Sequence, residues 1–129
     1  MAVTILTMKL HKERYGVCRL DSGSKIPQWA SSGELFSITR TSDELSVVCL
    51  EQVIPDEIQA EKSWRILEVL GPLDFSLTGI LAAISSILAA NGISLFALST
   101  YDTDYILVKE KDIDRAIAAL RNGNYEVIT

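Results

Sequence analysis

The sequence contains few of the residues on which enzymes most often rely. It has one histidine, His11, and two cysteines, Cys18 and Cys49, among 129 residues. His11 lies in a charged segment, so we expect a solvated loop residue, and no serine or cysteine then has a credible base. No His/Cys spacing suits zinc, no carboxylate ladder resembles a calcium loop, and no glycine-rich phosphate loop is present. The sequence therefore predicts a protein that is not an enzyme and that needs neither a cofactor nor a metal.

Basic residues are also scarce. The chain has 12 Lys and Arg against 17 Asp and Glu, which gives a net charge of −5. Nucleic-acid binding depends on neutralising phosphates, so we expect no nucleic acid partner. The N-terminus lacks the pattern of a signal peptide, and the apolar stretch from Leu77 to Leu98 is broken by Asn91-Gly92, which argues against a transmembrane helix. We therefore expect a cytoplasmic protein that does not enter a membrane, with reduced cysteines.

Charged residues are absent from Phe75 to Tyr101, although they make up 22% of the chain. Apolar residues recur there at helical spacing, as on one face of an amphipathic helix: Leu77, Ile80, Leu81, Ile84, Ile87 and Leu88. The opposite face is small and uncharged, where a helix facing water usually carries Lys and Glu: Thr78, Ala82, Ser85, Ser86 and Ala89. We expect this second face to meet protein, and we predict a homodimer or a larger assembly.

The order of the expected elements is clearest in the second half of the chain. Strand, helix, strand, strand, helix and strand are expected in turn, in the β-α-β-β-α-β order of a ferredoxin-like unit. The expected ranges are Trp64–Leu70, the uncharged helix up to Asn91-Gly92, Ile93–Thr100, Tyr105–Lys109, a helix capped by Asp112, and Tyr125–Ile128. In the first half we expect strands at Val3–Leu10, Tyr15–Leu20, Leu35–Arg40 and Leu45–Leu50, a shrunken helix near Ile26–Ala30, and a short helix at Pro55–Glu61.

An internal repeat links the two halves. A shift of 60 residues places Ser37–Val48 over Ala97–Val108, and both copies read as strand, polar four-residue turn and strand. The predicted fold class is therefore α+β, with two tandem ferredoxin-like (βαββαβ) subdomains built on antiparallel sheets. Residues 1–62 would form a degenerate N-terminal subdomain, and residues 63–129 a complete C-terminal one.

Two motifs in the second half of the chain resemble those of a known protein family. The first is GPLDFSLTGIL at residues 71–81, followed by an apolar helix and Asn91-Gly92-Ile93. It is similar to the family pattern D-x-P-G-x-L, with Thr78 in place of the usual proline and four residues between Asp74 and Gly79. The second is STYDTDY at residues 99–105. Together they resemble the small tandem ACT proteins related to the animal cytosolic arginine sensors and to the regulatory region of aspartokinases.

This resemblance implies an ACT-type fold and a non-catalytic regulatory protein that binds a small amino acid. The site would lie at an interface between ACT units, within one chain or across a homodimer. The candidate ligand-binding residues are Leu73, Asp74, Phe75, Ser76, Leu77, Thr78, Gly79, Ile80, Ser99, Tyr101, Asp102 and Thr103. The alternative is a ligand-free protein–protein interaction module that regulates a separate enzyme or regulator.

The chemistry of the two motifs suits an amino acid. A helix N-terminus favours a carboxylate, and Gly79 lets a ligand approach the backbone closely. Asp74, Asp102 and Asp104 are carboxylates that can accept an α-ammonium group. Structural roles are the alternative: Ser76 as an N-cap, Gly79 for tight helix packing, and the two later aspartates as turn formers.

Overall fold

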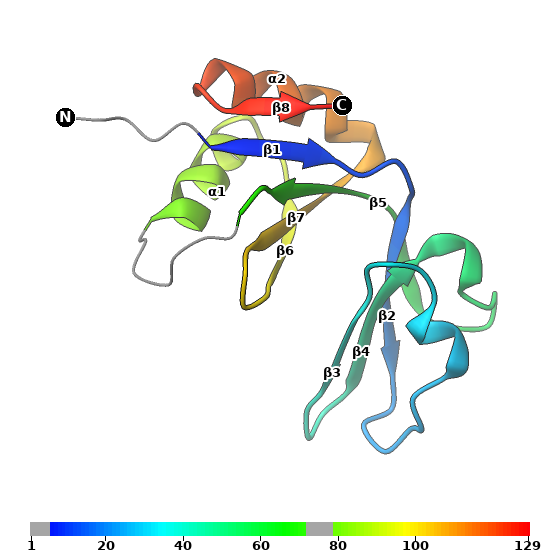
Figure 1. The fold of residues 1–129 in the computed structure, drawn as a ribbon. Helices are drawn as coiled ribbons and strands as arrows, with labels where there is room; N and C mark the ends of the chain where they lie inside the picture. The colour runs from blue at the N-terminus through cyan, green and yellow to red at the C-terminus, as the bar shows by residue number, and fades with distance from the viewer. Residues whose placement is uncertain (1–5, 72–78) are drawn as a thin grey trace. The chain divides into compact units, whose positions relative to one another are not determined.

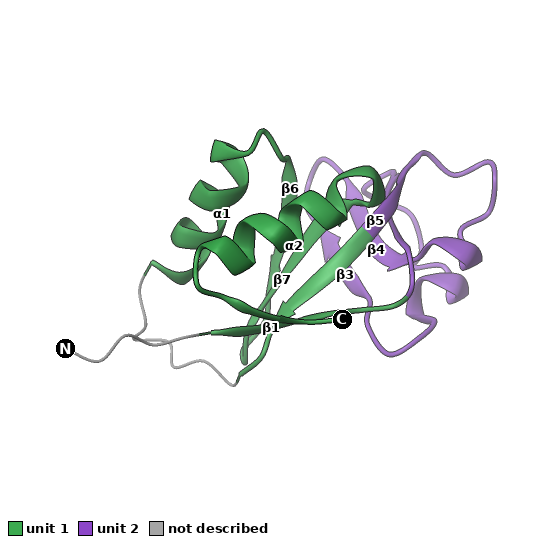
Figure 2. Cartoon of the chain, turned by 90° about the horizontal axis from the view of Figure 1, so that it is seen from above, with its two compact units in different colours: residues 1–12, 65–129 green, residues 13–64 purple. Residues whose placement is uncertain are grey.

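The computed structural model describes residues 6–71 and 79–129, and its chain divides into two compact units (Figures 1 and 2). Unit 1 contains residues 1–12 and 65–129, and unit 2 contains residues 13–64. Strand β5 (Ala60–Val69) begins in unit 2 and ends in unit 1. The chain therefore passes between the units twice: after Lys12, in a loop, and after Trp64, inside β5.

Unit 1 is a sheet whose two helices pack on one face. Its strands are ordered β6-β7-β5-β1-β8. Alternate strand residues share a single core with both helices, so both helices cover the same face. The elements besides β5 are β1 (Thr7–Leu10), α1 (Ile80–Ala90), β6 (Leu95–Ser99), β7 (Asp104–Lys109), the 3-10 turn η3 (Glu110–Asp112), α2 (Ile113–Asn122) and β8 (Glu126–Ile128). The buried core consists of Met8, Leu67, Val69, Ile84, Leu88, Ile93, Ile106, Val108, Ile113, Ala116, Ile117, Leu120 and Val127.

Strand β1 is inserted between the first and last strands of the expected β-α-β-β-α-β unit. It is antiparallel to β5 and parallel to β8, and Met8 is paired with Val69 on one side and Val127 on the other. The compact units therefore differ from the predicted subdomains, 1–62 and 63–129, in the placement of residues 1–12. Apolar alternation indicates that a segment is a strand, but it does not indicate which sheet the strand joins.

Unit 2 is an antiparallel sheet with the strand order β3-β4-β2-β5. Its elements besides β5 are β2 (Tyr15–Leu20), the 3-10 turn η1 (Gln28–Ser31), β3 (Ser37–Arg40), β4 (Leu45–Leu50) and the 3-10 turn η2 (Glu51–Val53). The helix expected near residues 26–30 is only the turn η1, so the degenerate form of the first half is confirmed. Together with unit 1 this confirms the predicted α+β fold class.

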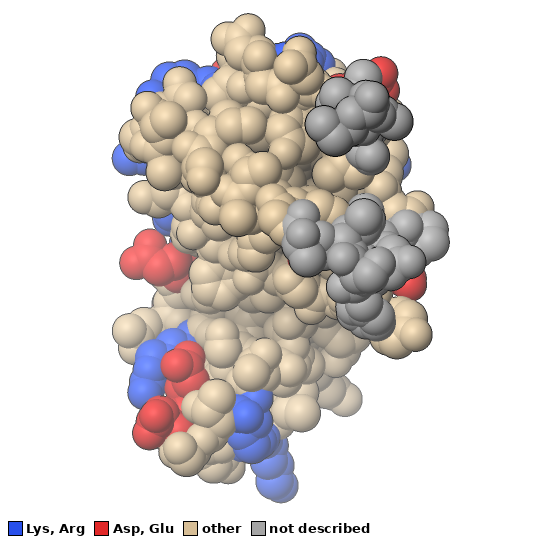
Figure 3. Space-filling model, turned by 90° about the vertical axis from the view of Figure 1, so that its left-hand side faces the viewer, with Lys and Arg blue, Asp and Glu red and all other residues tan. Residues whose placement is uncertain are grey.

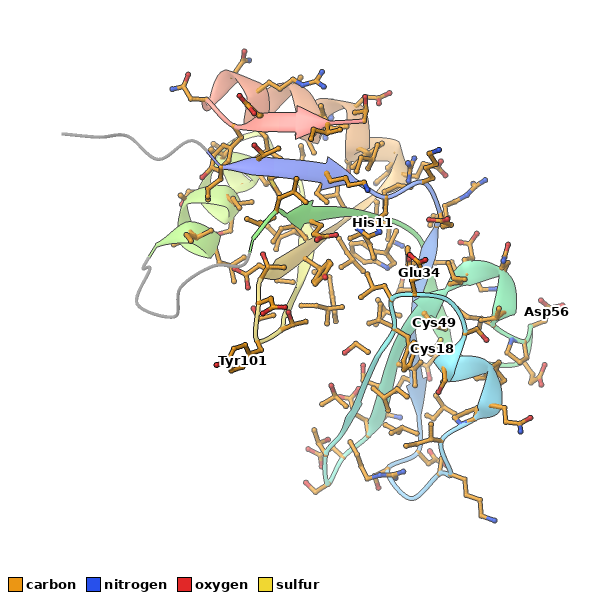
Figure 4. The ribbon with its side chains drawn as sticks, in the orientation of Figure 1. His11, Cys18, Glu34, Cys49, Asp56 and Tyr101 are labelled. Carbon is orange, nitrogen blue, oxygen red and sulfur yellow. The ribbon has the colours of Figure 1, made fainter. Side chains whose placement is uncertain are left out.

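Both cysteines lie in the core of unit 2 (Figure 4). They are free and buried, as expected of small core residues. The thiols of Cys18 and Cys49 form a hydrogen bond that lowers the pKa of Cys18 and raises that of Cys49, whose burial raises it further. A buried, hydrogen-bonded pair of this kind has a packing role.

One local prediction was wrong, and another was only partly right. Pro55–Glu61 forms no helix beyond one turn, in which the Ile58 amide donates to the Pro55 carbonyl at 3.1 Å. The chain is drawn into the sheet from Ala60 onward, where it pairs with β2. Asp112 occupies the N-cap position of α2, but its side chain makes no capping hydrogen bond, and its carboxylate instead accepts a hydrogen bond from Arg115 at 2.9 Å.

The two hairpins of the internal repeat close in the same way. The amide of Thr41 donates to the carbonyl of Glu44 at 2.8 Å, and the Thr41 hydroxyl accepts from the Glu44 amide at 3.1 Å. In the second copy, the amide of Thr100 donates to the carbonyl of Thr103 at 2.8 Å, and the Thr100 hydroxyl accepts from the Thr103 amide at 3.3 Å. The turns are thus equivalent at a spacing of 59 residues, one fewer than the sequence suggested.

Candidate functional site

The predicted ligand-binding residues fall into two groups. Leu73, Asp74, Phe75, Ser76, Leu77 and Thr78 lie outside the residues that the structure describes. The remaining candidates occupy two places in unit 1. Gly79 and Ile80 form the start of α1, whereas Ser99, Tyr101, Asp102 and Thr103 belong to the end of β6 and the turn that leads to β7.

The start of α1 is fixed by the backbone of Gly79. This residue is the N-cap, with a left-handed φ of +77°, and its carbonyl accepts from the Ala83 amide at 2.9 Å. A Cβ atom added at Gly79 would meet no described atom within 4 Å, so glycine is required by the positive φ and not by tight packing. Glycine contributes no side chain to cap the helix. The first amide groups of α1 therefore suit a ligand carboxylate.

The candidate side chains at the β6–β7 turn differ in how far they are buried. The Thr103 hydroxyl donates to the carbonyl of Val69, at the end of β5, and Thr103 is only 7% exposed. The Ser99 hydroxyl donates to the Asp104 carboxylate at 2.5 Å. Tyr101 is 79% exposed (Figure 4), and Asp102 is also exposed. Of the four candidates here, Thr103 is therefore the buried one, whereas Ser99, Tyr101 and Asp102 are exposed.

Negative charge dominates the segment that contains both places. Between Arg65 and Lys109 the sequence has no basic residue. Its acidic residues are Glu68, Asp74, Asp102 and Asp104. Burial raises the pKa of Tyr105, and the charges of Glu68 and Asp102 raise it further. The phenol of Tyr105 therefore stays protonated at neutral pH, and the charge near it comes from carboxylates.

His11 lies in the loop after β1, as expected, but its side chain is partly buried and not solvated. Its ring nitrogen Nε2 lies 2.8 Å from the Glu68 carboxylate. Its ring contacts that of Tyr105 edge-on, with 6.3 Å between the two ring centroids. Its backbone amide donates to the Ile66 carbonyl at 2.9 Å, and its carbonyl accepts from Arg65 at 3.0 Å. His11 thus attaches the end of β1 to β5. The charged neighbours of His11 in the sequence gave no indication of these contacts.

In residues 6–71 and 79–129, no group of three His, Cys, Asp or Glu side chains is placed to hold a metal ion. No helix in the described part of the chain has the length and apolar character needed to cross a membrane.

Comparison with family models agrees with the fold and the motifs. The model of the ACT domain matches residues 59–122, and a model of an N-terminal domain matches residues 13–57. The first range contains α1, β6, β7 and α2, as well as both places of the candidate site. The chain therefore belongs to the ACT-domain family.

The known proteins to which the chain is similar include a sensor and a regulatory subunit. It is 32% identical, over 98 residues, to the cytosolic arginine sensor for mTORC1 subunit 1 of Bos taurus, and the match covers 67% of this chain and 30% of the sensor. The chain thus spans less than a third of the length of that relative. A crystal structure of an Agobacterium tumefaciens protein is 36% identical, with a TM-score of 0.92 over 98% of this chain and 94% of that one. The regulatory subunit of aspartate kinase from Thermus flavus shares the fold, at 10% identity and a TM-score of 0.62 over 95% of this chain and 98% of that one.

Proposed function

We propose that this protein is a non-catalytic, cytoplasmic regulatory sensor that binds a small amino acid at an interface between ACT units. The start of α1 carries the proposal. A left-handed glycine, at which an added Cβ atom would meet no described atom within 4 Å, precedes helix amides that have no partner within their own helix. This arrangement suits the α-carboxylate that all amino acids share. It lies within the range that matches the ACT-domain model.

The charge of the segment favours a cationic amino acid. Gly79 and the β6–β7 turn belong to a stretch of the sequence that has carboxylates but no Lys or Arg between Arg65 and Lys109. Opposite charges attract, and an acidic ligand would be repelled. The relative from Bos taurus is named as an arginine sensor. Arginine is therefore the first ligand to test, with the exposed Asp102 as a partner for an ammonium or guanidinium group.

A thermal melting screen against the twenty amino acids tests this function. Arginine is expected to raise the melting temperature more than glutamate or aspartate does. A metabolite sensor responds near its pool concentration, so we expect a Kd of about 0.1–1 mM, or roughly −4 to −5.5 kcal/mol. At 100 times the Kd, the ligand adds about 2.7 kcal/mol to the free energy of unfolding. A melting temperature that no amino acid changes would leave the ligand-free interaction module as the better account.

We also propose a homodimer, because one face of α1 is exposed and uncharged. The eleven residues of α1 include no charged side chain. Its exposed residues are Ala82, Ala83, Ser86, Ala89 and Ala90. In Figure 3, residues other than Lys, Arg, Asp and Glu cover the face over α1. Such a face is suited to a second copy of the chain or, in the alternative function, to a separate regulated protein.

Light scattering tests the dimer. The wild type is expected to show a mass near twice 14.2 kDa at micromolar concentration. Ala89→Glu places a charge on the exposed face of α1 and is expected to give monomers, whereas Ala118→Glu, at an exposed alanine of α2, is the matched control and is expected to leave the dimer intact. A monomeric wild type would contradict the proposal.

A further inference from the structure

The hydroxyl of Thr103 joins the two strands that lead to the candidate site. We propose that Thr103 is a positioning residue, which holds the β6–β7 turn against the end of β5 and so fixes where Tyr101 and Asp102 meet a ligand. Its hydroxyl donates to the Val69 carbonyl, 34 residues away in the sequence. The inference rests on the proposed amino-acid site and adds to it a residue whose role is not ligand contact.

The acceptor of this hydrogen bond is itself held in place. Val69 is fully buried and paired with Met8 of β1. The next amide, that of Leu70, donates to the Thr7 carbonyl at 2.8 Å. The Val69 carbonyl is therefore fixed by the middle of the sheet. The β6–β7 turn, which is bonded to this carbonyl, is therefore held in one position, whereas the tip of a hairpin is otherwise mobile.

Closure of the turn does not require this hydroxyl. The Thr100 amide and hydroxyl bond to the backbone of Thr103, and the equivalent turn from Thr41 to Glu44 closes by the same pattern. The position equivalent to Thr103 in that turn is Glu44, so the first copy closes with no hydroxyl there. The side chain of Thr103 is thus available for the separate task of attaching the turn to β5.

Burial explains why the attachment is strong. A hydroxyl or carbonyl that is buried without a partner is costly, so donor and acceptor stabilise each other's position. Thr103 is the buried polar residue among the described ones. Thr103→Val keeps the shape of the side chain but removes the donor. The turn that carries Tyr101 and Asp102 then loses its hydrogen bond to the end of β5.

Amide hydrogen exchange on the ligand-free protein tests the attachment directly. In Thr103→Val, exchange at Leu70 is expected to be about five- to tenfold faster, the factor that one hydrogen bond supplies. Thr103→Ser retains the hydroxyl and is expected to exchange within about twofold of the wild type. Thr100→Val is the matched control, because its hydroxyl bonds only within the turn: it is expected to speed exchange at Thr103 and to leave Leu70 unchanged.

Arginine affinity tests the positioning role. We expect Thr103→Val to raise the Kd for arginine about tenfold and Thr103→Ser to restore it to within about twofold of the wild type. Unchanged exchange at Leu70 in Thr103→Val would overturn the attachment. Faster exchange with an unchanged Kd would overturn the positioning role. If the wild type binds no amino acid, the proposed function fails and the positioning role fails with it, while the exchange data still decide the attachment.

Discussion

Replacing Gly79 with valine is expected to abolish the stabilisation of the protein by its amino-acid ligand. The ligand carboxylate must approach the amides at the start of α1, and a branched side chain at the N-cap obstructs that approach without removing a charge or a core group. The structure supports this choice because a Cβ atom at Gly79 would meet no described atom within 4 Å. The measurement is the shift in melting temperature caused by saturating arginine.

Backbone strain is the main confounder, and the chain offers a matched control. Valine at a φ of +77° is strained whatever the surrounding space. Gly92, just beyond the other end of α1, has a φ of +69° and equally open space. Gly92→Val should therefore lower the melting temperature of the ligand-free protein by a similar amount and keep the full ligand shift. A folded Gly79→Val variant, checked by circular dichroism, that keeps the ligand shift would exclude the start of α1 as the site.

The fragment of residues 63–129 is expected to lack a cooperative unfolding transition. This fragment is the predicted C-terminal subdomain, but it lacks β1, which pairs with both β5 and β8. Its loss leaves two strands without their partner and removes Met8, a fully buried residue of the core. Losing one large apolar side chain from a core costs about 2–5 kcal/mol, and the ladder hydrogen bonds are lost in addition. Together these losses approach the entire stability of a small domain.

Urea titration followed by circular dichroism measures this directly. Adding a peptide of residues 1–12 to the fragment is expected to restore a cooperative transition, and the same peptide with Met8→Asp is the control that should fail. A fragment that unfolds alone, with the midpoint of the whole chain, would show that residues 63–129 are an independent domain. The boundary near residue 62 stays a prediction until that measurement.

Local sequence chemistry was sufficient for most of the fold. Asn91-Gly92 predicted the end of α1, and Gly92 indeed has the left-handed φ of +69° that ends the helix. Tyr15–Leu20 and Leu45–Leu50 are strands with the predicted bounds. The placement of β1 was not predictable in this way, because it depends on pairing with β5 and β8, which lie far along the chain. Long-range pairing has no local pattern in the sequence.

In the candidate site, too, the sequence predicted local features but not contacts between distant residues. The motif predicted that the loop ending at Gly79 leads into a helix, and Gly79 is the N-cap of α1. The positive φ supplies a backbone reason for that glycine, which the sequence assigned to ligand approach or tight packing. The sequence did not separate the roles of Tyr101 and Thr103, since both are polar residues of one turn. Burial separates them: Thr103 is 7% exposed and bonded to Val69, whereas Tyr101 is 79% exposed. The contacts of His11 were missed because Glu68 and Tyr105 are distant in the sequence.

Calorimetric titration of the wild type with arginine measures whether this chain binds an amino acid. We expect saturable heat with a Kd of about 0.1–1 mM, present in Gly92→Val and absent in Gly79→Val. Under the same conditions glutamate should bind more weakly, because the segment from residue 66 to residue 108 has acidic residues and no basic ones. An absence of heat for every one of the twenty amino acids, at concentrations about ten times the upper Kd, would contradict the account.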